Sequence, residues 1–265
     1  MVIDRDLHVH TFFSPCADPA MSLSAILEAA AAAGVKDVGL TDHPYRPGLA
    51  HHHEHLDRGR RAAGSSVRVW IGAELEVLGP QRLVLSTADL PLADYIVAAP
   101  SHYDLINFPP VSRMDSAAEW ADRLVGDMEN VPGSGAHAIA HPFFVYAIVV
   151  ANPPGLQLPK VEHILPLIMP RRLNNVLEKL AGESIALEIS PRAVQTPAFA
   201  AFMEDFYRRA RRMGIRFLIG SDSHRAATVG RLGGAAALVE RLGLTPDDLW
   251  HPAMARRDTA RSPAR

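Results

Sequence analysis

Histidines and acidic residues recur at the ends of short apolar runs along this chain. His8 and His10 lie at the end of the first run, and Asp222 and His224 follow the last. Each pair is separated by one residue, so on a β-strand both side chains of a pair point to the same side. Imidazole and carboxylate groups are ligands of Zn²⁺, Mn²⁺ and iron. The two pairs therefore predict one metal site, to which both ends of the chain contribute.

Further candidate ligands lie at the ends of the intervening runs: His43, Glu74, His102 and His141. Carboxylates that bridge two metals accompany such histidines, and we assign that role to Glu74. Asp42 precedes His43, and we interpret it as a residue behind the metals or as a proton carrier. A single His-x-His motif is more often an ordinary structural pair. The joint pattern indicates a site with more than one metal, because carboxylates are seldom buried at strand ends unless they are paired or bind metal.

The apolar runs that carry these residues alternate with helix-forming stretches. We predict strands at residues 3–10, 36–41, 67–77, 95–99, 136–140, 185–189 and 216–220. Strands that alternate with helices indicate a parallel sheet with helical crossovers. Seven contributing strand ends favour an α/β fold of the TIM-like (β/α)7 barrel type over an open sheet, whose ligands gather near one switch point. The active site of such a barrel lies at the C-terminal face of its strands.

Composition excludes several classes of protein. The chain has 265 residues, of which 48% are apolar and 21% are charged, which is typical of a globular protein. A net charge of −2 gives no sign of nucleic-acid binding, and no apolar stretch is long enough to span a membrane. One cysteine and the absence of a secretory pattern predict a cytoplasmic protein without internal disulfides. We expect a single barrel domain over residues 1–252 and a disordered tail over residues 253–265.

The motifs, in this order, resemble those of the polymerase and histidinol phosphatase (PHP) family. They are His8-Val9-His10, Thr41-Asp42-His43, Gly72-Ala73-Glu74, Ser101-His102, His141-Pro142 and the run from Gly220 to His224. The resemblance extends from residue 7 to about residue 225 and implies a distorted seven-stranded barrel. It also implies two or three divalent transition metals (Zn, Mn or Fe) at the C-terminal face.

The resemblance implies a ligand set for each metal. The first metal would be held by His8, His10, Glu74 and Asp222. The second would be held by Glu74, His102 and His141. The third would be held by His43, His224 and a ligand from the loop after the first strand.

That loop departs from the family pattern, because many members have histidine where this chain has Cys16. A thiolate is a good zinc ligand, and a third site would then persist with Cys16 as its ligand. Alternatively, Cys16 is a small buried cysteine that behaves as an apolar residue, or the centre holds only two metals. The sequence leaves these alternatives open. A second departure is Ser190, where the family pattern has asparagine, which leaves the role of Glu188 open.

The resemblance implies a hydrolase: a metal-dependent phosphoesterase that cleaves small phosphate monoesters, as a histidinol phosphatase does, with metal-activated water. Arg192 and Arg225 follow the last two strands, and either guanidinium could bind the substrate phosphate. A protonated Asp42 or a metal-bound water would supply a proton to the leaving group. Two alternatives remain: a phosphodiesterase or exonuclease acting on nucleotides or oligonucleotides, and a metal-bound regulatory module without turnover.

Two other histidine positions are assigned outside the centre. The run of histidines at residues 51–55 falls between the second strand and a basic helical stretch, and we predict a solvated lid segment there. His137 begins its strand, which places it at the bottom of the barrel.

Overall fold

The computed structural model describes residues 2–62, 64, 66–102, 116–145 and 158–259. Within these residues, seven parallel strands pair side by side in the order β1-β2-β3-β5-β6-β7-β8. Their bounds are Arg5–Val9 (β1), Asp37–Asp42 (β2), Arg68–Gly79 (β3), Tyr95–Ala99 (β5), Ala138–Ile139 (β6), Ala186–Ile189 (β7) and Phe217–Ile219 (β8).

The first and last strands meet and close the sheet into a barrel. Val9, at the end of β1, forms an isolated parallel bridge with Ser223, which follows β8. The amide of His10 donates to the carbonyl of Ser223 at 2.9 Å, and the amide of Asp222 donates to the carbonyl of His8 at 2.8 Å. The predicted TIM-like barrel is confirmed. These seam contacts place the C-terminal ends of β1 and β8 side by side.

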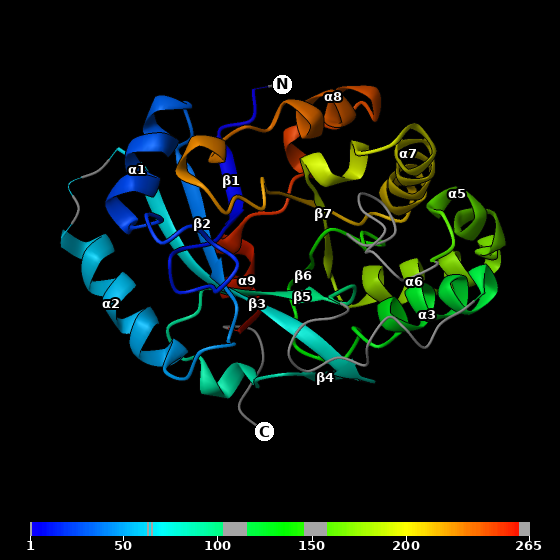
Figure 1. Ribbon diagram of the computed structural model, residues 1–265, viewed down its shortest axis with the longest axis horizontal. Helices are drawn as coiled ribbons and strands as arrows, with labels where there is room; N and C mark the ends of the chain where they lie inside the picture. Colours follow the sequence, from blue (N-terminus) through cyan, green and yellow to red (C-terminus); the bar gives the residue numbers. More distant parts are fainter. Residues whose placement is uncertain (1, 63, 65, 103–115, 146–157, 260–265) are drawn as a thin grey trace.

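Helices surround the strands: α1 (Leu23–Ala32), α2 (Leu49–Ala62), α3 (Ala117–Glu129), α5 (Val161–Ile164), α6 (Pro170–Gly182), α7 (Pro197–Arg212), α8 (Gly233–Arg241) and α9 (Pro252–Thr259). Figure 1 shows α1 and α2 on one side of the barrel and α3, α6 and α7 on the other. In α7 the buried residues are Phe199, Met203, Phe206, Tyr207 and Ala210. This helical spacing gives α7 one apolar stripe for the core.

One crossover contains no α-helix. Between β3 and β5 the chain forms the short antiparallel strand β4 (Arg82–Leu83) and the 3₁₀ turn η1 (Thr87–Asp89). β4 pairs with the end of β3, where Val77 faces Leu83. Gly79 ends β3 and is followed by Pro80 in the turn to β4. β3 thus extends two residues beyond the strand predicted from the sequence.

The interior of the barrel is filled by apolar side chains from strands all around it. Leu7, Tyr95, Val97, Ala186 and Leu218 belong to one buried cluster, together with Trp250 and Ala255 from the end of the chain. The Tyr95 hydroxyl donates to the carbonyl of Leu7 at 2.6 Å. A Cβ at Gly39 would lie 1.9 Å from that hydroxyl oxygen, so the neighbouring strand needs glycine there.

The C-terminal segment corrects the predicted tail. Residues 253–259 belong to helix α9, and Ala255 is buried in the interior cluster. The amide of Trp250 also donates to the carbonyl of Phe217 at 2.8 Å, which ties the segment before α9 to β8. Small apolar residues at the start of α9 pack against this interior cluster. The expectation for residues 260–265 lies outside the described residues.

No helix in the described part of the chain is long and apolar enough to cross a membrane.

Candidate metal centre

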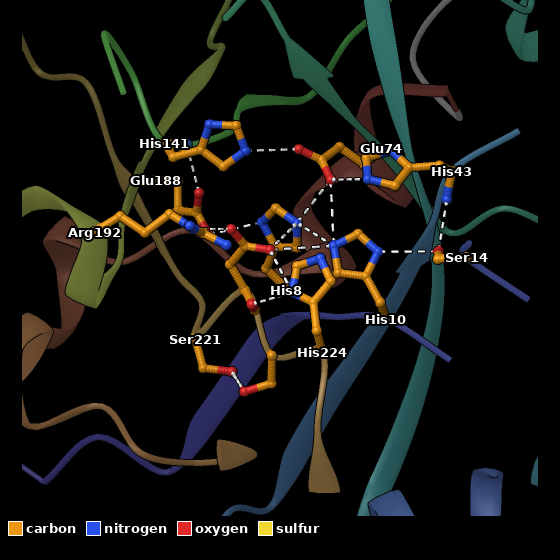
Figure 2. A network of polar contacts seen from close by, with 12 residues as sticks. His8, His10, Ser14, His43, Glu74, His141, Glu188, Arg192, Ser221 and His224 are labelled. Carbon is orange, nitrogen blue, oxygen red and sulfur yellow. Dashed lines mark hydrogen bonds and ion pairs between the residues drawn. The ribbon is translucent and has the colours of Figure 1, made fainter. Parts of the chain in front are cut away.

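Side chains from β1, β3 and the end of β8 converge at the C-terminal face of the barrel (Figure 2). The Nε2 atom of His8 lies 3.1 Å from Glu74 Oε2 and 3.2 Å from Nε2 of His10. Nε2 of His10 lies 3.2 Å from Asp222 Oδ1. All four side chains are buried. The structure therefore brings together the four residues that the family resemblance assigns to the first metal.

Glu74 also contacts three histidines from other strand ends. Its Oε1 atom lies 2.9 Å from Nε2 of His141 and 3.3 Å from Nε2 of His102. Its Oε2 atom lies 3.3 Å from Nε2 of His43. Because the two oxygens face different sets of histidines, Glu74 has the placement of a bridging carboxylate.

A third group contains the loop residue Cys16. Potential ligand atoms of His10, Cys16 and His224 lie within 4.8 Å of one another. Cys16 is exposed, so the alternative of a buried apolar cysteine is wrong. The structure groups His43 with Glu74 and His102, whereas the family resemblance places it beside His224.

The donor set fits divalent transition metals. Ring nitrogens of His8 and His10 face each other at 3.2 Å, and those of His102 and His141 do so at 3.1 Å. Imidazoles that point their Nε2 atoms at one place, beside carboxylate oxygens, are the ligand chemistry of Zn²⁺, Mn²⁺ and iron. A cation among them would satisfy these facing nitrogens together.

The charges of the centre shift the ionisation of its members strongly. Burial opposes ionisation of Glu74, but the neighbouring His8, His102 and His43 hold the pKa of Glu74 well below its usual range. Burial likewise opposes protonation of His10, while Asp222 and Glu74 raise its pKa to about 9. In the metal-free protein these carboxylates therefore favour protonation of His8 and His10, and metal binding would displace those protons.

Glu188 fixes the orientation of two members of the centre. Its Oε1 atom accepts from Nδ1 of His8 at 2.8 Å, so His8 presents Nε2 to the centre. Its Oε2 atom accepts from the backbone amide of His141 at 2.5 Å. A Cβ at Gly220 would lie 2.6 Å from Glu188 Oε1, which explains glycine at the end of β8.

Two of the candidate ligands have a backbone conformation that L-residues seldom adopt. The φ angle is 23° at His141 and 54° at Asp222. Such conformations cost free energy and persist where the surroundings enforce them, as at functional sites. His141 lies two residues after β6 and Asp222 three residues after β8, and both side chains contact the other members of the centre.

Asp42 lies behind the centre and acts there as an acceptor. It accepts from the backbone amide and the hydroxyl of Thr11, both at 2.7 Å, and from the hydroxyl of Ser14 at 2.7 Å. Since the Ser14 proton goes to Asp42, Nδ1 of His10 must donate to Ser14, at 3.1 Å. Burial would raise the pKa of Asp42, but hydrogen bonds from His52, Ser14 and Thr11 and the charge of His10 lower it to about 2. The oxygens of Asp42 are thus occupied as acceptors, which favours a positioning role over the predicted role as a proton donor.

The histidine run at residues 51–55 is part of helix α2, and the predicted lid loop is wrong. His52 and His53 are buried on the inner face of α2, whereas His51 and His55 are exposed. Nε2 of His52 lies 3.0 Å from Asp42 Oδ2, and its ring stacks on Phe13. The residue thereby connects α2 to the loop after β1.

The two candidate phosphate-binding arginines lie differently. Arg192, at the end of β7, forms an ion pair with Asp222 Oδ2, and its guanidinium lies 5.0 Å from the centre of the Phe144 ring. Arg225 follows His224 and is exposed. The structure thus places Arg192 in the wall of the centre and Arg225 outside it. His137 lies at the opposite end of the barrel, where its Nδ1 accepts from the amide of Ile96 at 3.0 Å.

The sequence analysis missed Glu76 and Ser14. Glu76 is fully buried and lies 3.5 Å from Nδ1 of His43. It stands two residues after Glu74, so the alternation that links His8 to His10 also applies to it. Ser14 had no comparable signal, because its place depends on the path of the loop after β1.

Fold and site together define a TIM-like barrel with a cluster of histidines and carboxylates at the C-terminal ends of its strands. The PHP domain model matches residues 6–128, in agreement with the family that the sequence motifs resemble. No curated protein sequence matches the chain at a significant level.

Two solved structures share the fold across nearly their whole length. One is histidinol phosphate phosphatase from Lactococcus lactis, solved with zinc, L-histidinol and phosphate. It is 19% identical, with a TM-score of 0.65, and the match covers 91% of this chain and 94% of that one. The other is the putative histidinol phosphatase of Listeria monocytogenes, which is 14% identical, with a TM-score of 0.63 and coverage of 86% and 97%.

Proposed function

We propose that this protein is a metal-dependent phosphatase that hydrolyses small phosphate monoesters. The observation that carries the proposal is the position of Glu74, whose two carboxylate oxygens contact histidines from β1, β2 and the ends of β5 and β6. A buried carboxylate surrounded in this way is built to hold two or more cations close together. We assign two or three divalent transition metals (Zn, Mn or Fe) to the centre.

Divalent metals at this centre would polarise the phosphoryl oxygens and lower the pKa of a water molecule, so that water can attack phosphorus. The chain supplies their ligands: His8, His10, Cys16, His43, Glu74, His102, His141, Asp222 and His224. Arg192 touches Asp222 with Nε, which leaves its terminal nitrogens for an oxygen of the phosphate. Arg225 is a second candidate for that contact from the rim.

Asp42 has a positioning role in this scheme. Through Ser14 it fixes the ring of His10, and through Thr11 it holds the start of the loop that carries Cys16. Its two oxygens accept hydrogen bonds, so a proton for the leaving group has to come from elsewhere.

The structural relatives support a phosphate ester as the substrate, since the protein from L. lactis was solved with phosphate and an amino alcohol. At 19% identity the likeness concerns the fold, and the alcohol part of the substrate is left to experiment. A phosphodiesterase and a regulatory module without turnover are the competing functions.

A substrate panel tests the proposal. The metal-loaded protein is assayed with nitrophenyl phosphate, its bis ester, short oligonucleotides and histidinol phosphate. We expect the monoesters to be hydrolysed fastest, and we expect Glu74→Gln and Asp222→Asn to lose more than about tenfold in turnover, or about 1.4 kcal/mol, while remaining folded. Faster cleavage of the bis ester or the oligonucleotides would favour the phosphodiesterase. Metal binding without hydrolysis of any of the four would favour the regulatory module.

A further inference from the structure

Glu76 is a buried carboxylate at the outer side of the centre. It lies on β3, two residues after Glu74, and its exposed fraction is 0%. Glu76 Oε1 lies 3.5 Å from Nδ1 of His43 and 3.6 Å from Nδ1 of His102. The opposite nitrogens of these two rings, their Nε2 atoms, both face Glu74. Glu76 therefore stands on the outer side of two candidate ligands.

No other described residue satisfies these atoms. Both oxygens of Glu76 and the Nδ1 atoms of His43 and His102 are buried, and none has a hydrogen-bond partner among the residues that the structure describes. Buried polar groups in proteins are nearly always paired. Within reach of the carboxylate are these two Nδ1 donors and the buried hydroxyl of Tyr45, which also lacks a partner among the described residues. The two oxygens of Glu76 have enough acceptor sites for all of them.

The tautomer of an imidazole ring decides which of its nitrogens can bind a metal. A neutral ring that donates from Nδ1 presents an unprotonated Nε2, which is the form that binds metal. The same arrangement is already formed elsewhere in the centre, where Glu188 accepts from Nδ1 of His8 at 2.8 Å. Glu76 can do this for two rings at once.

We propose that Glu76 is a positioning residue that sets the tautomer of both His43 and His102 and so prepares the metal site that these rings share with Glu74. The inference rests on the proposed function, because it requires that metals bind at the centre. The inference goes beyond that function because it makes one metal site depend on a residue that contacts no metal.

The effect should be confined to one site. His8 is oriented by Glu188 and His10 by Ser14, and Asp222 pairs with Arg192. The site that His8, His10 and Asp222 share with Glu74 therefore has its own outer partners. Removal of Glu76 should weaken one metal site and spare the other.

The substitution Glu76→Gln tests this with almost no change in shape. An amide offers one acceptor oxygen and one donor nitrogen, so it can satisfy one Nδ1–H and opposes the other. We expect one metal to dissociate about 10- to 100-fold more readily, the size of effect typical of lost outer partners, while a tighter metal is retained. Zinc titration with elemental analysis measures both affinities.

A second measurement reports the tautomers directly. Long-range ¹H–¹⁵N spectra of the zinc-loaded protein should show Nδ1–H forms for both His43 and His102. In Glu76→Gln one of the two rings should lose that form. A purely structural Glu76 would leave both tautomers and both affinities unchanged, and that result overturns the inference.

Tyr45→Phe is the matched control. The Tyr45 ring stacks on His43 at a centroid distance of 4.7 Å, and its hydroxyl is buried. Phenylalanine keeps the ring and removes a hydroxyl that lies against Glu76, but it leaves the carboxylate as acceptor for both Nδ1 atoms. This variant should therefore retain both zinc affinities, and a loss as large as that in Glu76→Gln would overturn the inference. If the wild-type protein binds no zinc, the proposed function fails together with the inference. Equal affinities in the wild type and Glu76→Gln overturn the inference alone.

Discussion

Cys16 gives this centre a ligand of different chemistry from the others. Its sulfur lies close to His10 and His224, at the exposed edge of the site. Partial desolvation of the sulfur by the surrounding protein, together with the carboxylates Glu74 and Asp222, raises the pKa of the thiol to about 12, so it is protonated when no metal is bound. A metal would have to displace that proton, and the resulting thiolate would favour zinc over harder cations.

Substitution of Cys16 tests this ligand. We expect Cys16→Ala to lower the metal content by about one ion per chain, because a site with three protein ligands loses one of them, whereas Cys16→His should retain it. In the cobalt-loaded protein, a thiolate-to-metal absorption band should be present in the wild type and absent from both variants. If Cys16→Ala keeps its full metal content and the wild type shows no such band, the third ligand lies elsewhere, and Asp18 is the nearest candidate in the loop.

Residues on strands could be predicted better than residues in loops. Alternation along a strand fixes the direction of a side chain, and the pair His8–His10 follows from it. Asp222 and His224 lie beyond the end of β8, and Asp222 has a positive φ, so their place in the centre depends on the turn after the strand. The rule of alternation would have found Glu76. Ser14 could not be found in this way, because a loop has no fixed period and the contacts of Ser14 form only when β1 and β2 are already in place.

At the scale of elements, helix α2 shows that polar residues at buried positions can obscure the apolar pattern by which a helix is predicted. Its buried positions are Leu49, His52, His53, Leu56 and Asp57, which have regular helical spacing. Three of these five positions are polar, so a search for apolar spacing does not detect the helix. The strands were predicted well because their cores are apolar and their ends carry the ligands.

His53 makes the stability of the α2 packing depend on pH. Its side chain is 2% exposed, and burial, with the neighbouring His52, lowers its pKa to about 4 from about 6.5 in the unfolded chain. Because the folded pKa is the lower one, the unfolded state binds the proton first, and stability falls as the pH falls from about 6.5 towards 4. We expect His53 to account for a loss of about 2 kcal/mol between about pH 7.5 and pH 5.

Urea unfolding of His53→Gln at both pH values measures this contribution. The variant cannot take up the proton. Its free energy of unfolding should therefore change with pH by about 2 kcal/mol less than that of the wild type. His55→Gln, on the exposed side of α2, is the control and should follow the wild type. Parallel pH profiles for all three proteins would show that His53 does not titrate in this range.

At the scale of the whole molecule, the centre lies across the seam of the barrel. β1 and β8 are joined by one bridge between Val9 and Ser223, whereas β2 and β3 pair along the whole of β2. Below the bridge, Asp6 accepts from the amides of Ser221 and Gly230 at 2.7 and 2.8 Å. Metals at the centre would add a second link above it, from His8 and His10 on one side of the seam to Asp222 on the other.

Removal of the metals should therefore loosen the seam more than the rest of the barrel. A metal present at 100 times its dissociation constant stabilises the bound form by about 2.7 kcal/mol, or about 100-fold in the population of open states. We expect chelation to speed hydrogen exchange at the amides of residues 8–10 and 220–224 by up to that factor, with little change along β2 and β3. In Asp222→Asn, which lacks the link across the seam, the same amides should exchange fast with or without chelator. Exchange that rises equally in all strands, or that does not respond to chelation, would mean that the barrel closes through its backbone contacts and Asp6 alone.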